Sequence, residues 1–333
     1  MVKINKTYLL FAIAIFLLFF ALMAVGTKYD LQISMALTDL ISGNYYSNNL
    51  FGRFFETIGE MPIYLIVAFA SAVIFHNVSR REKNFVTLIV KIFAILVSVA
   101  MLYYMSYKIF KYLSQHYDFE DLIGSIEDYI AYALFGCSIT GFLFYLTRNL
   151  PNKFLNKMLI WAITVWLTAL LSQTITHSLK GIAARPRFRA MFVIQDFNIF
   201  RSWFDFQGSV PELKEDWVNF YGASKDWFKS FPSGHTSAAS LLITLTTIPV
   251  LFEKTNKKNV KILLNISVYL FIFAVMLSRI IVGAHFLTDV TMGLFITVIS
   301  FVASRVIVKI VFSKYKMQEL PEKRLPRILE EAQ

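Results

Sequence analysis

The stretch Ser278-Arg279-Ile280-Ile281-Val282-Gly283-Ala284-His285-Phe286-Leu287-Thr288-Asp289 joins two long apolar runs in the last quarter of the chain. These runs cover about residues 263–282 and 286–303, and each is close to the roughly 20 residues that cross the hydrocarbon of a membrane. A cation, an imidazole and a carboxylate therefore stand together at the mouths of two predicted membrane helices. Ionisable groups at membrane depth are unfavourable, so they indicate a functional site by default.

The composition extends this reading to the whole chain, which is 56% hydrophobic and only 17% charged. Such values are typical of a polytopic membrane protein. Apolar runs of spanning length cover about residues 8–26, 61–76, 92–110, 129–146, 159–179, 235–251, 263–282 and 286–303. We therefore predict an all-α fold, a polytopic membrane helical bundle of about eight transmembrane helices that forms a single integral membrane domain over residues 1–333. The first run also resembles a signal peptide, because Ala24 and Gly26 fit a cleavage site; we favour an uncleaved helix.

The net charge of +11 does not indicate nucleic-acid binding, because the basic residues fall mostly in short loops between apolar runs. With the N-terminus inside, the basic loops 77–91, 148–157 and 253–261 and the basic C-terminal tail all lie on the cytoplasmic side, as the positive-inside rule requires. The acidic loop 111–128 and the long segment 180–234 then lie outside. The sequence thus predicts an integral plasma (inner) membrane protein with cytoplasmic N- and C-termini.

Under this topology Lys180, His235, Arg279 and His285 all lie at the outer ends of their spans. The topology was drawn from other loops, so this convergence independently supports one extracytoplasmic site.

The pair His285 and Asp289 is the first part of that site. If the segment after His285 is helical, the two side chains project from one face, four residues apart. A carboxylate behind an imidazole fixes its tautomer and makes the other nitrogen a better nucleophile or base. Arg279 adds a planar cation that suits a phosphate. The alternative is an interfacial histidine followed by an aspartate that only caps the helix.

The second part is Phe231-Pro232-Ser233-Gly234-His235-Thr236, directly before the sixth span. Proline and glycine shape a turn, and Ser233, Thr236 or Ser237 could cap the following helix. Helix N-termini bind anions, and His235 at the same place could donate a proton to a leaving oxygen. The alternative is an ordinary capped helix start at the membrane surface.

The third part, Lys180-Gly181-Ile182-Ala183-Ala184-Arg185-Pro186-Arg187-Phe188-Arg189, ends the fifth span with a cluster of cations. Alone, these residues could simply contact lipid headgroups. Together, the three parts supply an anion cage with a nucleophile and an acid. They contain no carboxylate cluster that would hold magnesium or zinc, so we predict no metal and no cofactor. The only cysteine, Cys137, lies in an apolar run and gives no disulfide framework. The set suits metal-free phosphoryl transfer, in which charge stabilisation does most of the work.

The sequence resembles the type 2 phosphatidic acid phosphatase family of membrane-bound lipid phosphate phosphatases. Its three signatures are matched by Lys180-x6-Arg187, by Pro232-Ser233-Gly234-His235 and by Ser278-Arg279-x5-His285-x3-Asp289, within a catalytic region of residues 180–293. The second and third signatures match in full. The first departs from the pattern, because the Arg-Pro pair of the family reads Arg187-Phe188 here. Arg185-Pro186 has the dipeptide but not the spacing from Lys180, so we favour Arg187 as the phosphate ligand.

The resemblance implies a six-helix-type phosphatase core and a role for each matched residue. His285 would attack phosphorus and form a phosphohistidine, Asp289 would orient it, and His235 would protonate the leaving oxygen and then activate water. The implied phosphate-binding residues are Lys180, Arg187, Ser233, Gly234 and Arg279.

The implied substrates are lipid phosphates or lipid diphosphates such as phosphatidic acid, phosphatidylglycerophosphate or undecaprenyl diphosphate, and the implied partners are membrane lipids. The aromatic-rich extracytoplasmic insert 188–230 is either a lid over the site or an aromatic belt that anchors the loop.

Three other functions are compatible with parts of the sequence. A lipid phosphotransferase would use the same site with another acceptor. A transporter would spread its charges through several helix middles, whereas here they gather at one end. A silent scaffold does not fit the complete set of His235, His285 and Asp289.

Overall fold

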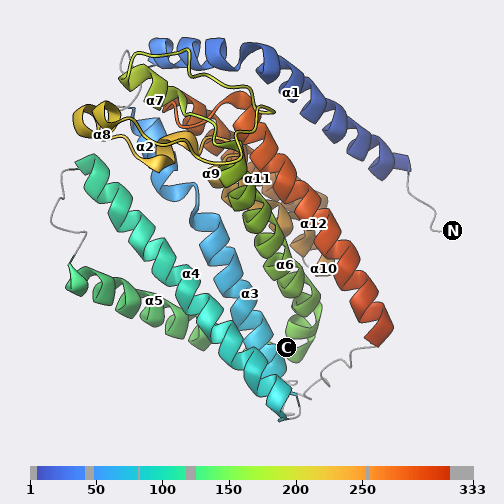
Figure 1. Cartoon of the computed structure of the whole chain (residues 1–333). Coiled ribbons are helices and arrows are strands. Elements are labelled where there is room, and N and C mark those ends of the chain that lie inside the picture. Colours follow the sequence, from blue (N-terminus) through green and yellow to red (C-terminus); the bar gives the residue numbers. More distant parts are fainter. Residues whose placement is uncertain (1–5, 42–48, 82, 118–124, 253–254, 316–333) are drawn as a thin grey trace, which may run out of the picture. The chain divides into compact units, whose positions relative to one another are not determined.

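The computed structural model describes residues 6–41, 49–81, 83–117, 125–252 and 255–315, and within these ranges all regular secondary structure is helical (Figure 1). Eight helical segments within them are long and apolar enough to cross a membrane. The predicted all-α class and the predicted number of spans are confirmed, and the chain is an integral membrane protein. Residues 118–124 of the predicted acidic loop 111–128, and the part of the basic tail beyond residue 315, lie outside the described residues.

The long helices are α1 (Lys6–Ile41), α3 (Met61–Ser79), α4 (Phe85–Tyr117), α5 (Ile126–Thr147), α6 (Asn152–Ala183), α11 (Lys258–Ile281) and α12 (Leu287–Tyr315). Large apolar side chains remain exposed on them, including Leu17, Leu96, Leu134, Leu170, Leu263 and Val302. Exposed apolar faces on helices of this length are suited to contact with lipid chains.

Helix α1 is longer than its predicted span of residues 8–26. The sequence turns more polar after Gly26, but the helix continues because Asp30, Ser34 and Thr38 recur at four-residue intervals on one buried face. Residues four apart share a helix face, so these polar groups lie together and are covered by protein. The short helix α2 (Leu50–Ile58) then precedes α3.

The predicted sixth span is divided into α9 (Gly234–Ser240), the 3₁₀ helix η3 (Leu241–Thr247) and α10 (Ile248–Leu251). Thr244, Thr246 and Thr247 each donate a side-chain hydrogen bond to the carbonyl three residues earlier. Such back-bonding competes with the regular α-helical pattern, which explains the tighter turn.

The described chain clusters into two compact units. The unit of residues 61–170, 241–268 and 300–333 contains α3, α4 and α5, which lie side by side (Figure 1). Its core is built on Ala68, Leu102 and Met105. At Gly136 of α5, an added Cβ would lie 2.8 Å from the backbone nitrogen of Tyr103 in α4, so only glycine permits this close approach.

The other unit contains residues 1–60, 171–240 and 269–299, and every predicted site residue falls within it. Its apolar core is formed by Phe188, Met191 and Phe286, packed against Leu31 and Met35 of α1. The rings of Phe19 and Phe295 stack with centroids 3.8 Å apart. The predicted single membrane domain stays a prediction.

Candidate active site

The loop between α11 and α12 places His285 where two helices end and begin. Gly283 adopts a left-handed conformation with φ +61°, and the backbone amides of Ala284 and His285 both donate to the carbonyl of Arg279 at 3.1 Å. Such left-handed glycines commonly end helices. The chain thus turns within a few residues and buries His285, whose side chain is 2% exposed.

The ring of His285 is held in one tautomer by a main-chain carbonyl. Its Nδ1 lies 2.6 Å from the carbonyl oxygen of Ser230. A carbonyl oxygen can only accept, so Nδ1 carries the proton and Nε2 keeps its lone pair. Burial, joined by the nearby charges of Lys180 and Arg187, holds the pKa of His285 well below its usual 6.5, although Asp289 opposes this shift. The imidazole is therefore neutral at physiological pH, as a nucleophile must be.

Asp289 lies close to His285 and is also linked to it through Ser230. Its Oδ2 accepts from the Ser230 hydroxyl at 2.5 Å and from the Phe286 amide at 2.8 Å, and lies 3.8 Å from Nδ1 of His285. The bond to Phe286 is the reciprocal half of a capping box, in which a carboxylate in the first helical turn returns to the amide before the helix. The direct hydrogen bond expected from the four-residue spacing is thus replaced by a relay through Ser230.

His235 stands at the start of α9, where Ser233 caps the helix by accepting from the Thr236 amide at 3.3 Å. Its Nδ1 lies 3.2 Å from a carboxylate oxygen of Glu60, and its Nε2 lies 3.2 Å from the carbonyl oxygen of Glu56. Both partners are acceptors, so this geometry favours an imidazole with a proton on each nitrogen. That form is the one a proton donor needs.

Arg187 and Arg279 point donors into the same buried region. Arg187 pairs with Asp226 at 2.9 Å, and Arg279 pairs with Glu56 at 2.9 Å. Within the described chain, Nε of Arg187 and both Nε and Nη1 of Arg279 make no hydrogen bond. Buried donors without a partner are unfavourable, by about 1–3 kcal/mol each. An anion bound here would satisfy them.

Lys180 reaches the same region from the end of α6. A Cβ added to Gly234 would lie 3.3 Å from Nζ of Lys180, so the glycine leaves room for the lysine beside the helix start. The backbone amide of Ser233 donates to the carbonyl of Asp289 at 2.9 Å, which joins the second and third motifs. The three motifs therefore meet within one compact unit.

The guanidinium of Arg185 binds protein groups and not the proposed phosphate site. Its guanidinium donates to Asp289 at 2.5 Å, to Asp30 at 2.9 Å and, through Nε, to the carbonyl of Arg201 at 2.8 Å. With all three nitrogens engaged, it has little capacity left for a phosphate, whereas Arg187 keeps a free donor. The geometry agrees with the preference for Arg187 drawn from its spacing.

Five residues at this site were missed by the motif reasoning: Asp30, Glu56, Glu60, Asp226 and Ser230. Four are acidic and come from α1, α2, the turn before α3 and the insert. For Asp30, Glu56 and Glu60 the signal was a carboxylate beside an apolar run, because such groups need a cationic partner. Ser230 carried no motif signal, although its carbonyl binds His285 and its hydroxyl donates to Asp289.

The insert 188–230 is partly packed and partly exposed. Helix α7 (Phe188–Val193) buries Phe188 and Met191, and the indole of Trp203 donates to the hydroxyl of Thr27 in α1 at 2.8 Å. Helix α8 (Glu215–Tyr221) instead has no buried residue. Exposed aromatic side chains of the insert are Phe204, Phe206, Phe220 and Tyr221. The choice between a lid and an anchoring belt stays open as a prediction.

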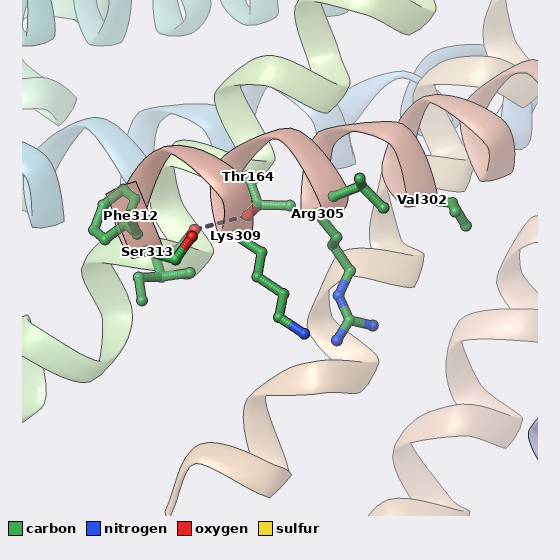
Figure 2. Close-up of a pocket in the computed structure, with 8 residues that line it drawn as sticks. Thr164, Val302, Arg305, Lys309, Phe312 and Ser313 are labelled. Atoms are coloured by element: carbon green, nitrogen blue, oxygen red, sulfur yellow. Dashed lines mark hydrogen bonds between the residues drawn. The ribbon is translucent and has the colours of Figure 1, made fainter. Parts of the chain in front are cut away.

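A cavity of about 750 Å³ lies in the other unit and contains none of the site residues. Figure 2 shows Arg305 and Lys309 extending beside one another from α12, and Thr164 of α6 also lines this cavity. Long cationic side chains near the end of a span commonly reach for the polar membrane surface.

Comparison with known families gives one match, in which the family model described as the PAP2 superfamily covers residues 161–313. The matched range includes the predicted residues of all three motifs. No curated protein and no solved structure matches the chain.

Proposed function

We propose that the chain is a phosphatase of the PAP2 superfamily, whose family model matches residues 161–313, and that it hydrolyses a lipid phosphate or lipid diphosphate through a phosphohistidine intermediate. The observation that carries this proposal is the environment of His285. Its Nδ1 donates to the carbonyl of Ser230, which leaves Nε2 as a buried, neutral nucleophile in the charge field of Arg187, whose Nε makes no hydrogen bond to the described residues.

In the first half-reaction, Nε2 of His285 forms a bond to the terminal phosphorus while the bond from that phosphorus to the leaving oxygen breaks; this is the lipid oxygen of a monophosphate or the bridging oxygen of a diphosphate. His235 donates its proton to that oxygen, and the doubly protonated form favoured by Glu60 suits this step. Lys180, Arg187 and Arg279 balance the charge that spreads over the phosphoryl oxygens. Ser233 and the amide of Gly234 complete the proposed phosphate site.

In the second half-reaction, His235 has lost its proton and can take one from an attacking water. The water oxygen bonds to phosphorus, the phosphorus–nitrogen bond breaks, and His285 is returned in its neutral form with Nδ1 still bound to Ser230. Inorganic phosphate leaves. We propose no metal in either step, because the cations named above supply the charge stabilisation.

The substrate is proposed to be a membrane lipid because the site residues lie at the ends of apolar helices. A lipid can keep its chains in the bilayer while its phosphate meets the cations. Candidates are phosphatidic acid, phosphatidylglycerophosphate and undecaprenyl diphosphate. The proposed setting is the plasma (inner) membrane, with the site on its outer face and both termini cytoplasmic, as the charge distribution of the loops favours.

The decisive experiment measures phosphate release from this panel of lipids by purified protein, with EDTA present. We expect turnover by the wild type and near-total loss in His285→Ala. His177→Ala is the matched control, since this exposed histidine lies on α6 outside the three motifs. Retained turnover in His285→Ala would overturn the nucleophile assignment, and phosphate appearing on an acceptor lipid instead of in solution would identify a phosphotransferase.

The membrane face can be tested separately. In a Cys137→Ala background, an added cysteine at exposed Ser209 in the insert should react with a membrane-impermeant maleimide in intact cells. Labelling only after the membrane is opened would place the site on the inner face.

A further inference from the structure

The N-terminal helix α1 approaches the start of α12 closely enough to share hydrogen bonds with it. A Cβ added to Gly26 would lie 2.6 Å from Cγ2 of Thr288, so glycine permits this approach. One turn later, the buried carboxylate of Asp30 accepts from the backbone amide of Thr288 at 3.1 Å and also bonds to its hydroxyl. Asp30 thereby occupies free donors of the first turn of α12, next to Asp289.

Arg185 connects Asp30 to Asp289. One terminal nitrogen of its guanidinium donates to Asp30 at 2.9 Å, and the other donates to Asp289 at 2.5 Å. The exposed fractions of the three side chains are 2%, 1% and 0%, so water screens these charges little. The guanidinium also lies over the ring of Phe286, 4.2 Å from its centroid, which restricts its position further.

The charges of Asp30, Arg185 and Asp289 sum to one negative charge, which lies near His285. With Asp289 and Arg185 alone, the guanidinium would cancel the carboxylate that faces the imidazole through Ser230. Asp30 restores the negative charge. This matters when His285 bonds to phosphorus through Nε2 and keeps its proton on Nδ1, because the ring then gains positive charge.

We propose that Asp30 is a positioning residue for the reaction, which orients Arg185 and supplies the negative charge that supports His285 during phosphorylation. The inference rests on the proposed function. It also assigns a role to α1, since Asp30 lies outside the family match over residues 161–313.

The test compares Asp30→Asn with Ser34→Ala in the full chain. Ser34 lies one turn further along the same buried face of α1, and its hydroxyl makes no hydrogen bond to the described residues. For Asp30→Asn we expect kcat to fall at least about tenfold, with KM changed less than about twofold, because the effect falls on the reacting state and not on lipid binding. Ser34→Ala should keep wild-type kinetics.

A change of charge is distinguished from a change of packing by the pH profile. Loss of the Asp30 charge disfavours protonated His285, so the acid limb of kcat/KM should move to lower pH in Asp30→Asn. A purely structural loss would lower the rate without moving the limb. If Asp30 acts through Arg185, the double variant Asp30→Asn/Arg185→Met should lose no more activity than Arg185→Met alone.

Wild-type kcat in folded Asp30→Asn, or an equal loss in Ser34→Ala, would overturn the inference. Phosphate release by the wild type and by His285→Ala tests the proposed function, so a failure of the proposed function can be distinguished from a failure of the role assigned to Asp30. Titration of His285 by NMR of isotope-labelled histidine gives a readout without turnover: we expect Asp30→Asn to lower the pKa of His285. An unchanged titration would refute the electrostatic link.

Discussion

The carboxylate of Asp226 lies 2.9 Å from the guanidinium of Arg187, so a residue of the insert is held by a cation of the proposed phosphate site. Although burial opposes ionisation, the charges of Arg187 and Lys180 lower the pKa of Asp226. It therefore stays ionised throughout the physiological range. A phosphate that binds Arg187 has to compete with this carboxylate.

We expect Asp226→Asn to lower KM and to strengthen inhibition by inorganic phosphate, each by up to about fivefold. Half-exposed ion pairs are worth up to about 1 kcal/mol, which sets this limit. The control is Asp205→Asn, because Asp205 forms an exposed pair with Arg201 in the same insert at 3.2 Å. Steady-state kinetics with added phosphate measure both effects; a raised KM in Asp226→Asn would contradict the competition.

Arg185→Ala and Arg187→Ala should fail in different ways. Arg187→Ala removes a proposed phosphate ligand, so we expect a folded protein with strongly reduced kcat/KM. Arg185→Ala leaves Asp30 and Asp289 buried without their cation, and breaking a buried pair typically costs about 3–5 kcal/mol. We therefore expect a loss of thermal stability together with activity. Thermal unfolding in detergent, measured alongside phosphate release, separates the two cases. A stable but inactive Arg185→Ala would indicate that Arg185, and not Arg187, is the phosphate ligand.

The pH dependence should reflect the buried state of His285. Because its pKa is held below 6.5, the residue stays neutral as the pH falls through 6.5 and loses its lone pair only at lower pH. We expect the acid limb of kcat/KM to lie below pH 6.5. A limb at or above 6.5 would show that a less buried group controls activity.

The proton donor can be identified by the leaving group. His235→Ala and Glu60→Gln should reduce kcat/KM far more for an alkyl phosphate than for p-nitrophenyl phosphate, because nitrophenolate leaves readily without a proton. The parameter kcat/KM covers the steps through formation of the phosphoenzyme, so later hydrolysis does not confuse the comparison. Equal losses for both substrates would argue that the pair only shapes the site.

The sequence predicted the parts of this protein that depend on local pattern. Span number follows from apolar length. The outer position of Lys180, His235, Arg279 and His285 was inferred from the charge of neighbouring loops and stays a prediction. The extension of α1 was missed because a polar stripe that is buried by protein looks like the end of a span.

Partners distant in sequence could not be predicted. Asp30 and Arg185 are 155 positions apart, and His235 and Glu56 are 179 apart, so no spacing rule joins them. The preference for Arg187 rested on spacing from Lys180, and the structure adds the physical reason, which is that Arg185 is occupied by two carboxylates. The link between Asp289 and His285 through Ser230 could not be predicted, because Ser230 lies 55 positions before His285 in the sequence and binds it through a main-chain carbonyl, which has no residue-specific signature.

The two tasks of Asp289 bear on how its variants are interpreted. One oxygen closes the first turn of α12 on the Phe286 amide and steadies Ser230, while the other faces Arg185. Even Asp289→Asn, which preserves shape, exchanges an acceptor for a donor and so disturbs the helix start and the reaction together. Loss of activity in an Asp289 variant therefore does not show by itself that Asp289 takes part in the reaction. A mutational scan that ranks residues by lost turnover would overstate the catalytic contribution of Asp289.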